Sequence, residues 1–318
     1  MTNEVQKVLQ AGWNIDSEIN KEWIGGNNTT WQVGDGPWLA RYNRDEVNRV
    51  IRELELYEYL SINQVRDPDM ILFVPEVIRT TRGTRFYDDG THLWKLSKHM
   101  EGIMPSQESA ELYPIIAYGL GHFHRKLREV PADFAVTSTQ VVRTVETYVS
   151  GIGNLSWVIR EDSAVKDIEE ENILLIKTAA QRLSSNFNRI QALPVQLIHG
   201  DFTHYNLRIK EDHTKLIGVL DLEFCSVDPA LLDLASVVLT LLNYSNLSEQ
   251  DKLITEIIKA YEYGGGGSVD PNVLEVAVLS RKFDSYWYHR NRLLEGKGTM
   301  ETYQRQLEQL KLFMATLG

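Results

Sequence analysis

The chain carries the stretch LIHGDFTHYNLRI at residues 197–209, and the stretch IGVLDLEF follows at residues 217–224. In the first stretch an apolar run leads to Asp201, and Asn206 stands just before a second apolar run. The second stretch is an apolar run that ends at Asp221. Each of the three oxygen-bearing side chains therefore stands at the end of a predicted strand, and we expect them to converge in space.

Such a set of side chains suits phosphoryl transfer. One carboxylate can orient or deprotonate a hydroxyl group, while an amide and a second carboxylate can hold Mg²⁺ on a nucleoside triphosphate. The alternative for Asp201 alone is a turn cap, because Asp and Gly are favoured in turns for backbone reasons. The presence of Asp221, followed by Asp228 and Asp233, favours the chemical interpretation.

Composition narrows the class of protein. The 318 residues are 43% hydrophobic and 24% charged, as in soluble globular proteins. The formal net charge of −11 argues against a nucleic-acid partner, since phosphate binding needs clustered Lys and Arg. A single cysteine, Cys225, excludes an internal disulfide and a multi-cysteine zinc site. The sequence shows no signal peptide or bilayer-length apolar run, so we expect a cytoplasmic protein without a membrane partner.

The pattern of predicted elements changes near residue 100. Residues 1–98 read as β-rich with one helix, whose apolar positions run from Val47 to Leu60. Beyond about residue 103 the pattern is mostly helical, interrupted by the strands around Asp201 and Asp221. Periodicity and capping signals predict helices at 112–127, 165–190, 231–244, 248–263, from 271 onward, and 300–317.

The His-Gly-Asp-x-x-x-x-Asn loop at 199–206 and the Asp-ended strand at 217–221 resemble the aminoglycoside phosphotransferase family, which includes homoserine kinase type II and choline kinase branches. The resemblance implies an α+β, bilobal, protein-kinase-like fold. The lobes would be a small β-rich nucleotide lobe at 1–98 and a mostly helical lobe at 99–318, with a hinge at 98–102. It also implies ATP and Mg²⁺ bound between the lobes, and transfer of the γ-phosphoryl group to a small-molecule hydroxyl.

The resemblance assigns roles to the polar residues. Asp201 would be the catalytic base, and Asn206 and Asp221 would be the Mg²⁺ ligands. His199 would be a structural imidazole that holds the loop. Asp233 would be a buried aspartate that braces the same loop through hydrogen bonds.

Further residues would bind the nucleotide. The family's loop over the phosphates falls on Gly25, Gly26, Asn27, Asn28 and Thr29, where a plain hairpin turn is the alternative. Extended backbone at the hinge would bind the adenine, with Lys98 and Met100 beside it.

One position departs from the family pattern. The third strand of the family presents a lysine to the α- and β-phosphates, paired with a glutamate on the next helix. The matching residues here are Arg41 and Glu53. An arginine keeps the charge and can bind in a bidentate manner, and the alternative is a structural surface pair.

Other assignments stay open at the level of sequence. Glu223 stands two residues after Asp221 and could assist the metal or face the substrate. Asp284 and Trp287 could line a pocket for an amine, although packing into the core is the simpler interpretation of this helix. The acceptor could be an amino alcohol, such as homoserine or choline, or an aminoglycoside-type antibiotic. A kinase-shaped binding or coat protein with little or no turnover is the alternative function, and the oligomeric state is left undefined.

Overall fold

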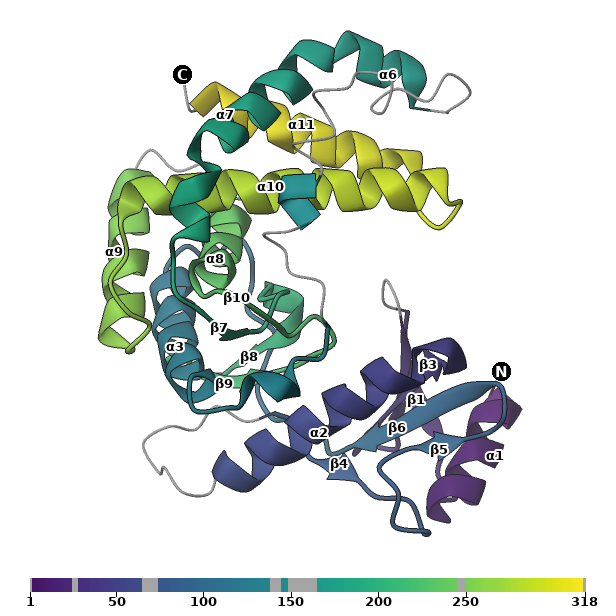
Figure 1. Ribbon diagram of the computed structural model, residues 1–318. Helices are drawn as coiled ribbons and strands as arrows, with labels where there is room; N and C mark the ends of the chain where they lie inside the picture. Colours follow the sequence, from purple (N-terminus) through teal and green to yellow (C-terminus); the bar gives the residue numbers. More distant parts are fainter. Residues whose placement is uncertain are drawn as a thin grey trace. The chain divides into compact units, whose positions relative to one another are not determined.

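The computed structural model describes residues 2–24, 28–64, 74–137, 144–147, 165–244 and 250–316 (Figure 1). Contacts divide the chain into two compact units. The first unit comprises Met1–Pro105, Asp133–Thr137 and Tyr205–Cys225, and the second comprises Ser106–Ala132, Ser138–His204 and Ser226–Gly318. The main boundary falls a few residues beyond the predicted hinge. Residues 205–225, which the sequence placed with the second lobe, group instead with the first unit.

The first unit contains a six-stranded antiparallel sheet. Its strand order is β1-β2-β3-β6-β4, and β5 also pairs with β6. The strands and helices are β1 (Ile19–Ile24), β2 (Thr29–Val33), β3 (Trp38–Asn43), β4 (Val77–Ile78), β5 (Tyr87–Asp88), β6 (His92–Ser97), α1 (Thr2–Trp13), the 3₁₀ turn η1 (Arg44–Glu46) and α2 (Val47–Gln64). A turn at Asp89-Gly90 joins β5 to β6, and the Gly90 N–H donates to the Asp88 side chain at 2.8 Å.

Helix α1 is an element that the sequence reasoning did not predict. Its residues Val5, Val8 and Leu9 follow helical spacing and are buried, together with Trp13. They form one hydrophobic cluster with Trp31, Val33, Leu39, Trp94 and Leu96 of the sheet. One face of the sheet is therefore covered by α1.

A second, short hairpin belongs to the first unit. Strands β8 (Leu207–Ile209) and β9 (Leu216–Val219) pair in antiparallel register, and the 3₁₀ turn η3 (His204–Asn206) leads into β8. The chain beyond β6 lies against this hairpin, since Ile103 and Ile209 exchange backbone hydrogen bonds of 2.9 Å. Gly102, at a φ of 94°, allows this approach, because a Cβ there would lie 2.5 Å from the Ile209 carbonyl oxygen.

The second unit is mostly helical. Its two-stranded sheet pairs β7 (Val195–Ile198) with β10 (Ser226–Pro229). The helices are α3 (Leu112–Leu127), α6 (Lys166–Glu171), α7 (Ile173–Gln191), α8 (Leu231–Tyr244), α9 (Gln250–Tyr263), α10 (Pro271–Leu294) and α11 (Met300–Thr316), and the 3₁₀ turn η2 (Ala132–Phe134) follows α3. The Asp270 side chain caps α10 by accepting from the Asn272 N–H at 2.8 Å, with Pro271 next to it. The predicted α+β class is confirmed.

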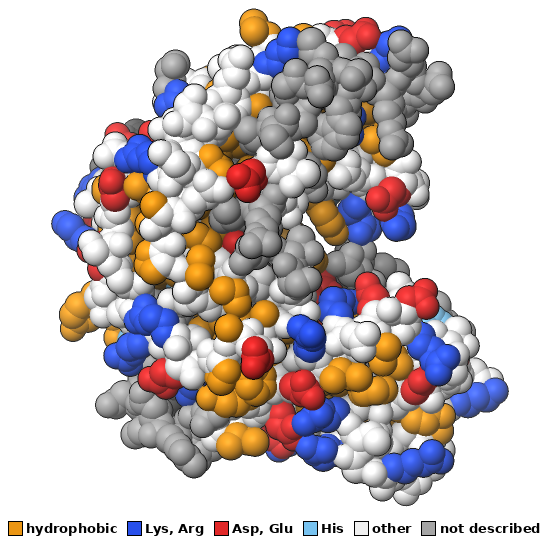
Figure 2. Space-filling view, in the orientation of Figure 1, with side chains coloured by type: hydrophobic (Ala, Val, Ile, Leu, Met, Phe, Trp, Pro, Cys, Tyr) orange, Lys and Arg blue, Asp and Glu red, His pale blue; other side chains and the backbone are white. Residues whose placement is uncertain are grey.

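Positive and negative side chains are mixed on the surface that Figure 2 shows. On the face drawn in Figure 2, the described Lys and Arg side chains lie among Asp and Glu side chains. The net negative charge is therefore not gathered into one acidic patch on that face. Within the described residues, each helix is too short or too polar to cross a lipid bilayer.

Candidate active site

Asn206 and Asp221, the two predicted metal ligands, stand at the same end of the β8–β9 hairpin. Asn206 precedes β8 and Asp221 follows β9, and Leu207 pairs with Val219 across the hairpin. The Leu220 N–H donates to the Asn206 carbonyl oxygen at 2.8 Å, which joins the two ends directly. The antiparallel register thus brings together two residues that are fifteen positions apart in the sequence.

Asp221 has an unusual backbone conformation. Its φ of 59° lies in the left-handed region, which Asp tolerates better than most residues. Its N–H donates at 2.8 Å to the phenol oxygen of Tyr57, which comes from α2. Burial, together with the negative charges of Glu53 and Asp221, raises the pKa of Tyr57, so the phenol keeps its proton at neutral pH. Helix α2 therefore positions the end of the hairpin.

Glu53 does not pair with Arg41, and this corrects the expected contact. The Glu53 carboxylate is buried and accepts from Lys95 Nζ at 3.0 Å and from the Tyr42 hydroxyl at 3.3 Å. Arg41 instead lies against two tryptophans, with its guanidinium carbon 5.4 Å from the ring centroid of Trp31 and 5.9 Å from that of Trp94. The alternative of a structural Arg41–Glu53 surface pair fails for the same reason.

Glu223 belongs to a polar cluster of the first unit. Its side chain is buried and accepts from the Arg49 guanidinium and, at 3.3 Å, from Asn28 Nδ2. Arg49 also forms a salt bridge with Glu46 at 2.5 Å. Glu223 thus neutralises a helix arginine and holds one residue of the predicted phosphate loop. Gly25, Gly26 and Asn27 lie outside the described residues, and Thr29 begins β2.

The predicted hinge residues have identifiable neighbours. The Lys98 ammonium forms an exposed salt bridge with Glu76 at 2.7 Å, and the Lys98 N–H donates to the Glu76 carbonyl oxygen at 2.8 Å. Met100 packs over Gly218 of β9, where a Cβ would lie 2.0 Å from the Met100 sulfur. The Lys98 side chain therefore points to solvent and is paired there, while Met100 lies over the hairpin.

Asp201 stands in a tightly held loop of the second unit. Strand β7 delivers His199, and Gly200 follows with a φ of 81°, which favours glycine. The Asp201 N–H donates to Nδ1 of the buried His199 ring at 3.1 Å. His199 thus holds the loop through its imidazole, as the resemblance implied.

Asp233 of α8 braces the same loop. Its Oδ2 accepts from the His199 N–H at 2.8 Å and its Oδ1 from the Gly200 N–H at 3.0 Å. Its Oδ2 also lies 2.9 Å from Nε2 of His124, a buried residue of α3. Burial alone would raise the pKa of Asp233, but the hydrogen bonds from His124 and His199 hold it below its usual value. The structure shows the bracing hydrogen bonds that the resemblance implied.

Arg281 of α10 is a contributor that the sequence reasoning did not single out. Its guanidinium donates to the Gly200 carbonyl oxygen at 2.8 Å and to Ser236 Oγ at 3.0 Å. It also bonds to Asp284 at 3.4 Å, one helical turn away. The available signal was only the i, i+3 spacing of Arg281 and Asp284, which does not reveal the contact with the loop.

The two substrate candidates on α10 differ in their surroundings. Trp287 is buried, stacks on Phe283 at 6.1 Å between centroids and lies under the Arg290 guanidinium, so it packs in the core. The Asp284 side chain is 23% exposed, and burial raises its pKa. The Arg281 guanidinium opposes this rise, and the negative charges of Asp228 and Asp201 add to it.

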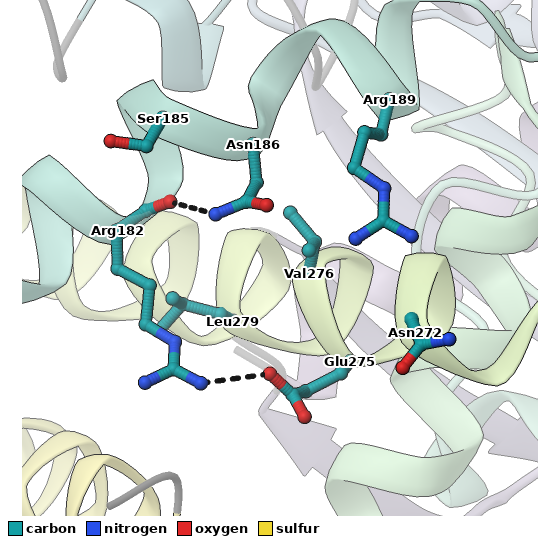
Figure 3. A pocket seen from close by; sticks show the side chains of 8 residues that line it. All are labelled: Arg182, Ser185, Asn186, Arg189, Asn272, Glu275, Val276 and Leu279. Carbon is teal, nitrogen blue, oxygen red and sulfur yellow. Dashed lines mark hydrogen bonds and ion pairs between the residues drawn. The ribbon is translucent and has the colours of Figure 1, made fainter.

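One surface pocket lies away from these groups. It has a volume of ≈ 400 Å³ and is lined by side chains of α7 and α10, with Arg182 Nη2 donating to Glu275 at 3.1 Å (Figure 3). All of the predicted site residues lie outside its lining.

Comparison with known proteins agrees with this fold. The profile of the phosphotransferase enzyme family matches residues 23–271. The structure of APH(2")-IIia with GDP and kanamycin is similar at a TM-score of 0.71 and 13% identity, covering 98% of this chain and 99% of that chain. The structure of spectinomycin phosphotransferase with ADP and spectinomycin is similar at a TM-score of 0.63 and 16% identity. The match covers 100% of this chain and 95% of that chain.

A third similar structure is an aminoglycoside phosphotransferase from Alicyclobacillus acidocaldarius. Its TM-score is 0.62 at 16% identity, with 98% of this chain and 94% of that chain covered. No curated protein sequence matches the chain significantly. The predicted kinase-like fold is confirmed by these structures.

Proposed function

Because the chain belongs to the phosphotransferase enzyme family, we propose that it transfers the γ-phosphoryl group of ATP to a hydroxyl group of a small molecule. The observation that carries this proposal is the juxtaposition of Asn206 and Asp221 at one end of the β8–β9 hairpin. The carboxylate of Asp221 and the amide oxygen of Asn206 are the hard oxygen donors that Mg²⁺ prefers.

In the proposed reaction Asp201 accepts the proton of the acceptor hydroxyl. The acceptor oxygen forms a bond to the γ-phosphorus, the bond from that phosphorus to the β,γ-bridging oxygen breaks, and ADP leaves with the bonding electron pair. Mg²⁺ held by Asp221 and Asn206 would neutralise charge on the phosphate oxygens. His199, Asp233 and the Arg281 contact with Gly200 keep the loop of Asp201 in place.

We propose that the acceptor carries amino groups. The charge of Asp201 acts on the carboxyl group of Asp284, and the partly exposed Asp284 side chain would attract a cationic acceptor. The structures solved with kanamycin and with spectinomycin, although only 13% and 16% identical, support an antibiotic of this kind. Homoserine, a zwitterion, and choline, a quaternary ammonium cation, stay as alternative acceptors, since each carries a positively charged nitrogen.

A nucleotide-release assay against a panel of acceptors tests the proposal. The protein is incubated with Mg²⁺ and either ATP or GTP, and with kanamycin, spectinomycin, homoserine, choline or the uncharged polyol glycerol. We expect acceptor-dependent diphosphate release with an amine-bearing compound, and a product heavier by one phosphate by mass spectrometry. Release that no acceptor stimulates, with both nucleotides, would contradict the proposed activity.

A further inference from the structure

The register of the sheet in the first unit separates two cations that are close in space. Strand β3 pairs with β6 so that Ala40 lies opposite Lys95 and Arg41 lies opposite Trp94. Directly opposed residues share a face of an antiparallel sheet, and successive residues alternate between the two faces. Arg41 and Lys95 therefore point to opposite faces of the same sheet.

The face of Arg41 is the one that α1 covers. Trp31 and Trp94, which flank the Arg41 guanidinium, belong to the hydrophobic cluster built with α1. The face of Lys95 is the one that carries α2, since Lys95 bonds to Glu53 of that helix. Tyr57, on the same helix, holds the backbone of Asp221. The second face, through α2, therefore leads to Asp221, a predicted metal ligand.

The surroundings of Lys95 suit a phosphate-binding ammonium. Its side chain is 10% exposed, and its Nζ lies 4.5 Å from the ring centroid of Tyr57 and 5.4 Å from that of Tyr42. Within the described residues, Nζ donates one hydrogen bond, to Oε1 of Glu53 at 3.0 Å, whereas an ammonium has three N–H donors. The other oxygen of Glu53, Oε2, is buried without a hydrogen-bond partner among the described residues. Glu53 thus orients the lysine through one oxygen.

Arg49 of α2 is another cation of the first unit. Its guanidinium already bonds to two carboxylates, those of Glu46 and Glu223. Its charge is therefore more than balanced by its own neighbours. Among the described residues, Lys95 forms a salt bridge with one carboxylate, that of Glu53, and the Tyr42 hydroxyl also donates to that carboxylate.

We propose that Lys95 of β6, oriented by Glu53, binds the phosphate oxygens of the nucleotide in this protein, and that Arg41 of β3 does not. This assignment rests on the proposed function, because it requires a nucleoside triphosphate as the phosphoryl donor. It moves the phosphate-binding cation from the third strand to the strand that precedes the hinge. The register of the sheet is compatible with this exchange, since the residue directly opposite Lys95 is the small Ala40.

The test compares a double variant, in which Lys95 and Glu53 are both replaced by neutral residues, with a control variant at Arg41 on the opposite face of the sheet. Lys95→Met alone would leave Glu53 as a buried unpaired charge and could prevent folding. The double variant Lys95→Met/Glu53→Gln removes both charges at nearly constant volume, and Arg41→Gln removes the cation of the opposite face. Calorimetry measures the affinity of each protein for adenosine, guanosine, Mg·ATP and Mg·GTP, and circular dichroism monitors folding.

We expect the double variant to bind the nucleoside as the wild type does, and to bind the matching Mg·triphosphate at least about tenfold more weakly. A purely structural pair would change both affinities together, or neither. In Arg41→Gln, the Mg·triphosphate should still bind more tightly than the nucleoside by the same factor as in the wild type.

Two results overturn the assignment, and they differ from each other. If the wild type binds the triphosphate and the double variant binds it equally well, Lys95 is not the phosphate cation, while the proposed function stands. A selective loss in Arg41→Gln would lead to the same conclusion. If the wild type binds neither triphosphate, the proposed function itself fails, and the role of Lys95 fails with it.

Discussion

The loop that carries Asp201 and the hairpin end that carries Asp221 are held in different ways. In the second unit, the buried carboxylate of Asp233 on α8 and the guanidinium of Arg281 on α10 form hydrogen bonds with the backbone of the loop. In the first unit, the Asp221 N–H donates to the neutral hydroxyl of Tyr57 at 2.8 Å. Charge-assisted hydrogen bonds are roughly twice as strong as neutral ones. We therefore expect the loss of these hydrogen bonds to cost more stability at the loop of the proposed base than at the hairpin end.

The largest expected effect concerns catalysis. Asp201→Asn keeps the shape of the side chain but removes the proton acceptor, and general-base assistance contributes roughly 10²- to 10⁴-fold to rate. We expect kcat to fall within or beyond that range, while nucleotide affinity and the free energy of unfolding stay near wild type. Steady-state kinetics with the best acceptor checks this. Equal turnover in the two proteins would exclude Asp201 as the base.

Next in size is the stability of the braced loop. Asp233→Ala leaves two backbone N–H groups and the imidazole of His124 without their acceptor in a buried place. We expect a loss of about 3–5 kcal/mol in the free energy of unfolding, as for a broken buried charged pair. Urea unfolding measures it. Asp233→Asn keeps one carbonyl acceptor and should lose less, so equal losses in both variants would argue against the hydrogen-bonding explanation.

At the hairpin end, we expect substitution to affect nucleotide affinity more than stability. Asp221→Asn removes the charge but tolerates the left-handed conformation of this position. Loss of one charge-assisted contact, worth about 1.5–3 kcal/mol, predicts a drop of roughly tenfold or more in Mg²⁺-dependent triphosphate affinity. The urea midpoint should change little. A calorimetric affinity equal to that of the wild type would remove Asp221 from the metal site.

Removing the hydroxyl of Tyr57 tests how much the hydrogen bond to the Asp221 backbone contributes to stability and to nucleotide affinity. Tyr57→Phe leaves the Asp221 N–H without its acceptor and should cost about 1 kcal/mol of stability. Affinity for the Mg·triphosphate should fall by less than in Asp221→Asn, because the carboxylate remains. Tyr118→Phe, on an exposed tyrosine of the second unit, is the control for loss of a hydroxyl. A larger effect in the control than in Tyr57→Phe would contradict this account.

The smallest effect is a pH dependence within the second unit. Burial raises the pKa of Asp284, so the folded state binds its proton more tightly than the unfolded chain does. The contribution of Asp284 to stability therefore falls as the pH rises from its ordinary value of 3.8 through the raised value. The pKa of Asp233 is lowered, so its contribution is present above 3.8 and is lost as the pH falls through the lowered value.

The comparison of wild type with Asp284→Asn isolates the first of these two dependences. Urea unfolding from pH 3 to pH 7 should show the wild type losing stability relative to the variant as the pH rises above the ordinary value. A constant difference between the two proteins across this range would exclude a raised pKa at Asp284.

Local signals in the sequence were sufficient for most of the second unit. The apolar periodicity predicted α3 and α8 with the bounds that the structure has, and the Asp-Pro cap predicted the start of α10. The motif at 199–206 and the strand at 217–221 likewise identified the loop and hairpin that carry Asp201, Asn206 and Asp221. Helix α1 was missed because its apolar stripe is short. The residues of that stripe are recognised as core residues only from their contacts with the sheet.

By itself the sequence determined most of the helices after residue 100 and the three polar positions at strand ends, because helical periodicity, caps and loop motifs are read within a few neighbouring residues. The kinase-like class followed from the family resemblance that those motifs carry. The tertiary structure decided which cation meets Glu53 and which helix arginine holds Gly200. A strand reverses its faces with every residue, so the side of the sheet that Arg41 or Lys95 occupies follows from pairing register. Contacts such as that of Arg281 with Gly200 join segments 81 positions apart and form only when the chain has packed.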